Sequence, residues 1–257
     1  MLGIAEFDLI LLLLAALFAG FVDAVAGGGG LIQVPTLLVT LPAESPATVF
    51  GTNKLSSIFG TGNAALRFAR RIALPWRIAL PAAAAAFLFS FTGAAAVTWL
   101  PREVVRPLVL GLLVLVLVYT VSKPAFGAVS GSRLAPALER RWALLAGAVL
   151  GFYDGFFGPG AGSFMIFAFV HFFRLDFLHA SSVAKVVNLA TNAAALAYFA
   201  PTGHVLWVLG LAMAVFNIAG ALFGARLALH HGSGFVRGVF ILVASVLIAR
   251  LGYDTFA

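Results

Sequence analysis

The sequence contains no cysteine among its 257 residues. Disulfide bonds, thiolate metal sites and cysteine nucleophiles are therefore excluded. Charged side chains are also scarce: they make up 10% of the chain, against about 25% in an average soluble domain, while 62% of the residues are hydrophobic. A surface with so few charges cannot face water on every side, so the composition indicates an integral membrane protein.

The chemistry of common enzymes and nucleic-acid binders is missing as well. The formal charge of +7 comes from basic residues that stand singly or in short clusters between apolar runs, which is typical of membrane-protein loops. No Ser-His-Asp or paired-carboxylate pattern is present, and the adjacent His230 and His231 would point to different sides of a helix. We therefore expect no enzyme activity, no metal site, no cofactor and no nucleic-acid partner.

The two halves of the sequence match each other at one fixed shift of 131 residues. The most informative matches join rare residue types: Asp23 and Asp154, Lys54 and Lys185, Trp76 and Trp207, Arg106 and Arg237. The chain holds three lysines, and two of them form one of these pairs. This pattern predicts a duplication, with a first repeat at 1–122, a cytoplasmic connector at 123–139 and a second repeat at 140–257.

Each half contains five apolar segments, which in the first half cover 7–24, 31–41, 47–69, 76–100 and 104–121. All but the second reach the roughly 20 residues that a helix needs to cross about 30 Å of hydrocarbon. The second would make a helix of roughly 16 Å, so we expect a half-helix, a short tilted crossing or a re-entrant segment. The predicted fold is all-α, with two homologous repeats of about five helices or half-helices each.

The basic residues predict how the two repeats are oriented. In the first repeat they cluster between the third and fourth segments, at 67–77. In the second repeat the corresponding loop, 201–205, has no Lys or Arg, and the basic residues lie one loop later, at 226–237. Because cytoplasmic loops are enriched in Lys and Arg, we expect an inverted second repeat, five crossings each and both termini outside. Four crossings per repeat is the alternative.

Four charged residues, Asp23, Lys54, Asp154 and Lys185, lie within or at the edge of apolar segments. An ionised side chain at the bilayer centre costs at least about 2.5–3.5 kcal/mol, so it normally has a partner or faces a water-filled path. One interpretation is two structural ion pairs, each holding one repeat together. The other is a substrate route in which the lysines bind an anion and the aspartates are coupling groups. The sequence leaves both open.

Two glycine-rich stretches, Gly27–Gly30 and 158–163, follow the first segment of each half. Each glycine destabilises a helix by about 1 kcal/mol relative to alanine, and Pro159 removes a backbone donor, so we expect the helices to break here. We expect Ser163 to be the N-cap of the short segment that follows, whose free N–H groups and dipole suit an anion. The alternative is that these glycines serve tight helix packing.

Polar residues follow each lysine at three and seven positions, on one helix face: Ser57 and Thr61 in the first half, Asn188 and Asn192 in the second. They either join helices or replace the water shell of an oxyanion. The predicted substrate-binding set is Gly28, Gly29, Gly30, Asn53, Lys54, Gly160, Gly162, Ser163, Lys185, Asn188 and Asn192, with Asp23 and Asp154 as coupling or ion-pair residues.

These motifs resemble a known family. The run Gly20–Gly30 followed by Val34-Pro35 is similar to the opening of the sulfite exporter TauE/SafE family of membrane permeases, as are Thr52-Asn53-Lys54, Gly158-Pro159-Gly160 and Ala184-Lys185 to its later segments. The resemblance covers essentially the whole chain. It implies a multi-pass carrier in the inner (plasma) membrane for sulfur-containing anions such as sulfite, thiosulfate or organosulfonates.

The residues and the resemblance lead to one hypothesis. An oxyanion binds near the bilayer midplane between the repeats, held by N–H groups after the two breaks and countered by Lys54 and Lys185. The repeats then rock to give alternating access, with proton coupling as an option. An anion channel, a carrier of another small organic anion and a cation importer that uses the aspartates are the alternatives. The expected partners are a small anionic substrate and the lipid bilayer.

Overall fold

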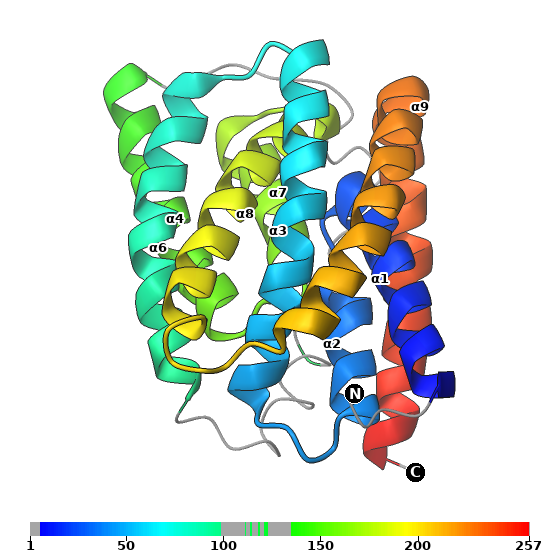
Figure 1. Cartoon of the computed structure of the whole chain (residues 1–257). Coiled ribbons are helices and arrows are strands. Elements are labelled where there is room, and N and C mark those ends of the chain that lie inside the picture. Colours follow the sequence, from blue (N-terminus) through cyan, green and yellow to red (C-terminus); the bar gives the residue numbers. More distant parts are fainter. Residues whose placement is uncertain are drawn as a thin grey trace.

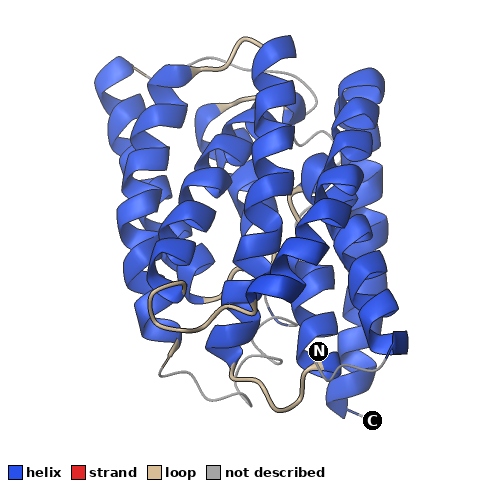
Figure 2. Ribbon diagram, in the orientation of Figure 1, coloured by secondary structure: helices blue, strands red, loops and turns tan. Residues whose placement is uncertain are grey.

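The computed structural model describes residues 6–98 and 135–256, with a few isolated positions between 111 and 122. Across these residues the chain is helical and has no strand (Figure 2). The helices are α1 (Glu6–Ala26), α2 (Gly30–Thr40), α3 (Pro46–Arg71), α4 (Trp76–Val97), α6 (Pro136–Phe156), α7 (Ala161–Phe173), α8 (Phe177–Phe199) and α9 (Trp207–Phe256). Most of the predicted fifth segment, 104–121, lies outside the described residues, as do Arg102, Arg106 and the connector up to residue 134.

The helix boundaries confirm the first four predicted segments to within a few residues. Shifted by 131 residues, α1 to α4 fall on α6, α7, α8 and the first part of α9, so the helix order of the two halves is the same. Gly232, with φ of 73°, bends α9 and separates a fourth from a fifth segment. α6 begins at Pro136, so residues 136–139 of the predicted connector are already helical.

Helix length and apolarity agree with a multi-pass membrane protein. Among the described residues, α1, α4 and the part of α9 up to Gly232 are long and apolar enough to cross a bilayer. α3 and α8 contain 26 and 23 residues, which makes them about 39 and 35 Å long, but they carry most of the buried polar groups. α2 and α7 have 11 and 13 residues, which confirms that the second segment of each half is short.

The short helices α2 and α7 each reverse the direction of the helix before them. In Figure 1, α1 and α3 run from the bottom of the view to the top, whereas α6 and α8 run from the top to the bottom. α2 returns toward the end from which α1 starts, and α7 returns toward the end from which α6 starts (Figure 1). Each glycine-rich stretch therefore forms the tip of a helical hairpin inside the bundle.

Glycines at the helix crossings allow the backbones to approach closely. A Cβ on Gly20 of α1 would lie 2.1 Å from the carbonyl oxygen of Asn217 in α9. At the matching crossing of the second half, a Cβ on Gly151 of α6 would lie 2.5 Å from Ala86 Cα in α4. Small residues allow such contacts between membrane helices. The α1–α9 and α4–α6 interfaces are therefore built in the same way.

Candidate functional site

The two glycine breaks lie against each other. Gly27 has φ of 76°, and Gly158 and Gly160 have φ of 83° and 80°, a left-handed conformation that glycine adopts without strain. The predicted helix breaks are thus confirmed. A Cβ on Gly27 would lie 2.5 Å from the carbonyl carbon of Gly162, so the break in the first half directly contacts the start of α7.

Ser163 does not have the role that the sequence suggested. The N-cap of α7 is Gly160, which makes no side-chain cap hydrogen bond, so the prediction that Ser163 caps this helix is wrong. The left-handed Gly160 starts the helix at Ala161, before Ser163 is reached. The Ser163 hydroxyl instead donates a 2.9 Å hydrogen bond to the carbonyl oxygen of Ala26. It satisfies one of the carbonyls that the C-terminus of α1 leaves without a helical partner.

The four buried charges form two ion pairs, and each pair joins the two halves. Lys54 Nζ lies 2.7 Å from Asp154 Oδ1, and both side chains are only 3% exposed. Lys185 Nζ lies 3.7 Å from Asp23 Oδ2 and also donates to the Asp23 backbone carbonyl. The interpretation that each pair holds a single repeat together is therefore wrong. Because the two breaks face each other, each aspartate reaches the lysine of the opposite half.

The two ion pairs differ in the distance between their charged atoms and in the exposure of their aspartates. Thr61 donates a 3.0 Å hydrogen bond to Asp23 Oδ2, and Thr191 donates to Asp154 Oδ2. The Asp23 side chain is 14% exposed and lies farther from its lysine than Asp154 does from Lys54. The Lys185–Asp23 pair is therefore the looser of the two.

A small polar cavity of about 20 Å³ lies beside these pairs, which is room for about one water molecule. It is lined by Asp23, Gly27, Gly30, Asn53, Lys54, Ser57, Thr61, Asp154, Gly158, Gly162, Asn188 and Asn192. Both halves contribute, largely through residues at the 131-residue spacing, such as Thr61 and Asn192. The site thus lies at the contact between the two repeats, and its cavity is too small for an anion such as sulfite.

The comparison with known proteins identifies the family to which the chain that forms this junction belongs. The sequence profile described as "Sulfite exporter TauE/SafE" matches residues 12–251, a range that contains both breaks and both ion pairs. The chain belongs to this family.

Relatives of this TauE/SafE protein are described as probable membrane transporters. The protein YfcA of Escherichia coli strain K12 is 36% identical over 244 residues, which cover 95% of this chain and 89% of YfcA. A Sinorhizobium protein is also 36% identical over 244 residues, 95% of this chain and 92% of its own. A Haemophilus influenzae protein is 34% identical over 247 residues, 94% and 95% of the two chains. No solved structure matches significantly. The chain is thus a membrane transporter, not an enzyme.

The transporter's cavity brings together only part of the predicted substrate-binding set. Gly30, Asn53, Lys54, Gly162, Asn188 and Asn192 line it, whereas Gly28, Gly29, Gly160, Ser163 and Lys185 do not. Gly29 is a packing residue, since a Cβ there would lie 2.5 Å from the Ala19 carbonyl oxygen. Lys185 is fully buried and contacts Asp23.

Asn53 brings to this cavity a hydrogen-bond acceptor that is unpaired among the described residues, which suits a donor such as water. It is 4% exposed, and its Oδ1 has no hydrogen-bond partner in the part of the chain that the structure describes. A buried polar atom that stays unpaired costs about 1–3 kcal/mol. By contrast, Asn188 accepts a 2.8 Å hydrogen bond from the Asn192 amide, so these two groups already support each other.

Sequence reasoning missed two polar residues that support the site. The Tyr153 hydroxyl donates a 2.7 Å hydrogen bond to the Pro159 carbonyl and so fastens the second break to α6. The Asn217 amide of α9 donates to the Ala16 carbonyl of α1 at 3.2 Å and to Gln33 Oε1 of α2 at 3.3 Å. The available signal was the isolation of Asn217, which stands alone among the apolar residues between 207 and 225.

We expect Tyr153→Phe to lower the thermal unfolding midpoint in detergent by roughly 2–4 °C, since a hydrogen bond contributes about 1 kcal/mol. Tyr198→Phe is the control, because no hydrogen bond of its hydroxyl occurs within the described residues. Equal midpoints for the two variants would contradict a role of Tyr153 in fastening the break.

Proposed function

We propose that this transporter carries a small sulfur-containing oxyanion, such as sulfite, thiosulfate or an organosulfonate, across the inner membrane by alternating access. The observation that supports this most is the pair of crossed ion pairs beside one cavity that both halves line. An anion in the cavity competes with Asp154 for Lys54, the lysine that lines the cavity. Binding of the anion and loosening of the junction between the halves are then one event.

The order of opening follows from the difference between the pairs. The carboxylate contact between Lys185 and Asp23 is longer and partly exposed, so it separates before the Lys54–Asp154 contact, while the Asp23 backbone carbonyl still accepts from Lys185. Lys54 brings the cationic donor to the cavity, so it forms the first contact with the anion. The N–H groups of Leu31 and Ile32 already donate to Gly28 and Gly29, so α2 contributes positive potential through its dipole at Gly30.

Many alternating-access transporters are built from two halves of opposite orientation, and we propose that these halves are inverted repeats. The equal spacing of their helices and the opposite directions of α3 and α8 in Figure 1 support this. The end of α3 and the starts of α4 and α6 lie together at the top of that view and carry Arg71, Arg77 and Arg140. The excess of positive charge supports a cytoplasmic location for this end.

Uptake of radiolabelled sulfite, thiosulfate, sulfoacetate and sulfate into proteoliposomes tests the substrate class. We expect saturable uptake of at least one of these anions, measured with and without a pH gradient. Stimulation by the gradient would establish proton coupling. Uptake that rises linearly with concentration would instead indicate a channel.

The negative control must fold, which a single charge removal does not ensure. Lys54→Ala/Asp154→Ala removes a buried pair without leaving an unpaired charge, so it is the matched inactive variant. If wild-type protein that is folded and reconstituted takes up none of these anions, the substrate class is wrong. The same vesicles should then be tested with small carboxylates, the substrates of an organic-anion carrier.

A further inference from the structure

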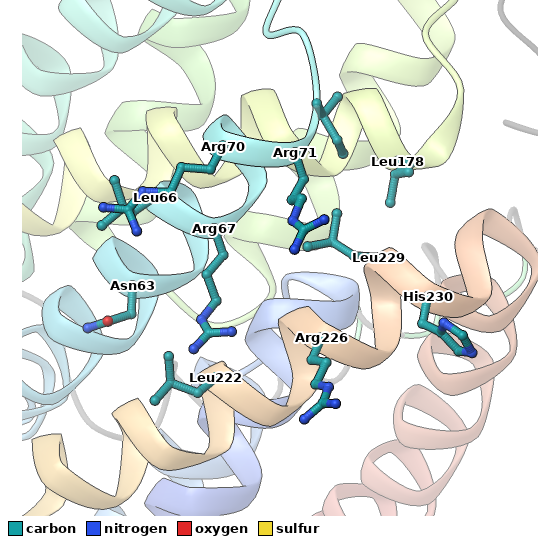
Figure 3. Close-up of a pocket in the computed structure, with 11 residues that line it drawn as sticks. Asn63, Leu66, Arg67, Arg70, Arg71, Leu178, Leu222, Arg226, Leu229 and His230 are labelled. Carbon is teal, nitrogen blue, oxygen red and sulfur yellow. The ribbon is translucent and has the colours of Figure 1, made fainter.

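A second, much larger cavity lies between the end of α3 and α9, with a volume of about 860 Å³ (Figure 3). Arg67, Arg70 and Arg71 line it from α3, and Arg226 and His230 from α9. Among the described residues, no carboxylate lines this basic cleft and none of its arginines forms an ion pair. Four arginines thus line one cleft, and none of them has an acidic partner among the described residues.

The basic cleft and the transport cavity share no lining residue. Lys54, Ser57 and Thr61 form the stripe of α3 that faces the transport cavity. At 3.6 residues per turn, Arg67 and Arg70 are turned from Thr61 by about 120° and 180° around the helix. Arg67 and Arg70 therefore project from another side of α3 than Thr61, whereas Arg71 is turned from Thr61 by only about 80°.

Apolar side chains share the basic cleft with the arginines. Arg67 and Arg71 extend from α3 toward Leu222 and Leu229 of α9 (Figure 3). Leu66, which is 50% exposed, also lines the cleft. Leu222 lies about one turn of α9 nearer the bundle centre than Arg226. Leu222 and Leu229 thus lie on either side of Arg226 along α9, and apolar contacts next to the charges suit an amphiphile.

The basic cleft exists at one end of the protein only. At the 131-residue spacing, Arg67, Arg70, Arg71 and Arg226 correspond to Tyr198, Pro201, Thr202 and Ala95. The opposite end thus lacks every one of these positive charges. A ligand of this cleft is therefore recognised on one side of the membrane.

We propose that the basic cleft binds the phosphate headgroup of an anionic phospholipid of the cytoplasmic leaflet, with an acyl chain lying on the leucines. Arginine binds phosphate with paired hydrogen bonds, and basic pockets between membrane helices on this side bind such headgroups. Because α3 and α9 belong to different halves, the lipid would bridge the two. This inference does not depend on the transported substrate.

Lipid retention measured by native mass spectrometry tests this proposal. Purified protein is titrated with phosphatidylglycerol, cardiolipin or phosphatidylcholine in detergent, without any transport substrate. We expect Arg67→Gln/Arg71→Gln to bind the anionic lipids roughly 10- to 30-fold more weakly, since each charge contributes about 1 kcal/mol. The control Arg77→Gln/Arg140→Gln removes two arginines that line a different cavity, beside Glu139, and should bind as wild type does.

Two results would overturn the proposal. One is equal lipid retention by both double variants. The other is displacement of the lipid by millimolar inorganic phosphate or sulfite, which would identify a site for a soluble anion. If Arg67→Gln/Arg71→Gln does not fold, Arg226→Gln on α9 serves in the same titration. Because no transport is measured, a wrong substrate class leaves this result unaffected.

Discussion

Lys54→Ala should destabilise the transporter by roughly 3–5 kcal/mol, because it leaves Asp154 as a buried charge without its partner. The Asp154 carboxylate is 3% exposed and would retain the Thr191 hydroxyl as its hydrogen-bond donor. One hydroxyl does not replace an ammonium group at 2.7 Å. The measurements are thermal unfolding in detergent and the yield of monodisperse protein.

Removing both partners separates stability from transport. In Lys54→Ala/Asp154→Ala no charge stays buried alone, so we expect most of the lost stability to return while anion uptake stays absent. If this variant transported at the wild-type rate, Lys54 would have only a structural role. If it remained as unstable as Lys54→Ala, the pair would not account for the destabilisation.

The second pair provides an internal comparison. Asp23 is 14% exposed and 3.7 Å from Lys185, so Asp23→Asn should lower stability less than Asp154→Asn does. The two aspartates occupy matching positions in the repeats, which makes this a matched test of the structural difference. Equal losses would show that the two pairs are equally closed in the membrane.

The fold could be predicted largely from the sequence because its determinants are local. The length of an apolar run decides whether a helix can cross a bilayer, and glycine and proline decide where it breaks. Because the halves match at a shift of 131 residues, the segments predicted for the first half also predicted those of the second. The predicted N-cap of α7 was wrong because the left-handed Gly160 begins the helix before Ser163.

The site could be predicted only in part because its contacts are not local. Asp23, Lys54, Asp154 and Lys185 were recognisable as buried charges, but which aspartate meets which lysine depends on how the two breaks pack against each other. No spacing along the chain contains that information. The arginines of the basic cleft were likewise recognisable as a topology signal, whereas the cleft arises from the separation of α3 and α9.

Gly27→Ala should prevent the transporter from folding, although it adds a single methyl group. A Cβ at this position would lie 2.5 Å from the carbonyl carbon of Gly162 and 2.7 Å from its oxygen, and φ of 76° disfavours any side chain. Both the backbone conformation and the contact between the breaks would have to change. We expect little monodisperse protein, measured by size-exclusion chromatography of the solubilised membrane fraction.

The neighbouring glycines provide the controls. A Cβ on Gly28 would have ordinary contacts, 3.4 Å from Leu31 and 3.5 Å from Ser163, so Gly28→Ala should match wild type in yield and uptake. A Cβ on Gly30 would lie 3.4 Å from Pro159, but this residue lines the cavity, so Gly30→Ala should fold and lose uptake. This order distinguishes packing, which requires Gly27, from ligand contact, which requires Gly30. If all three variants behaved alike, the four glycines would act as one flexible segment rather than as separate contacts.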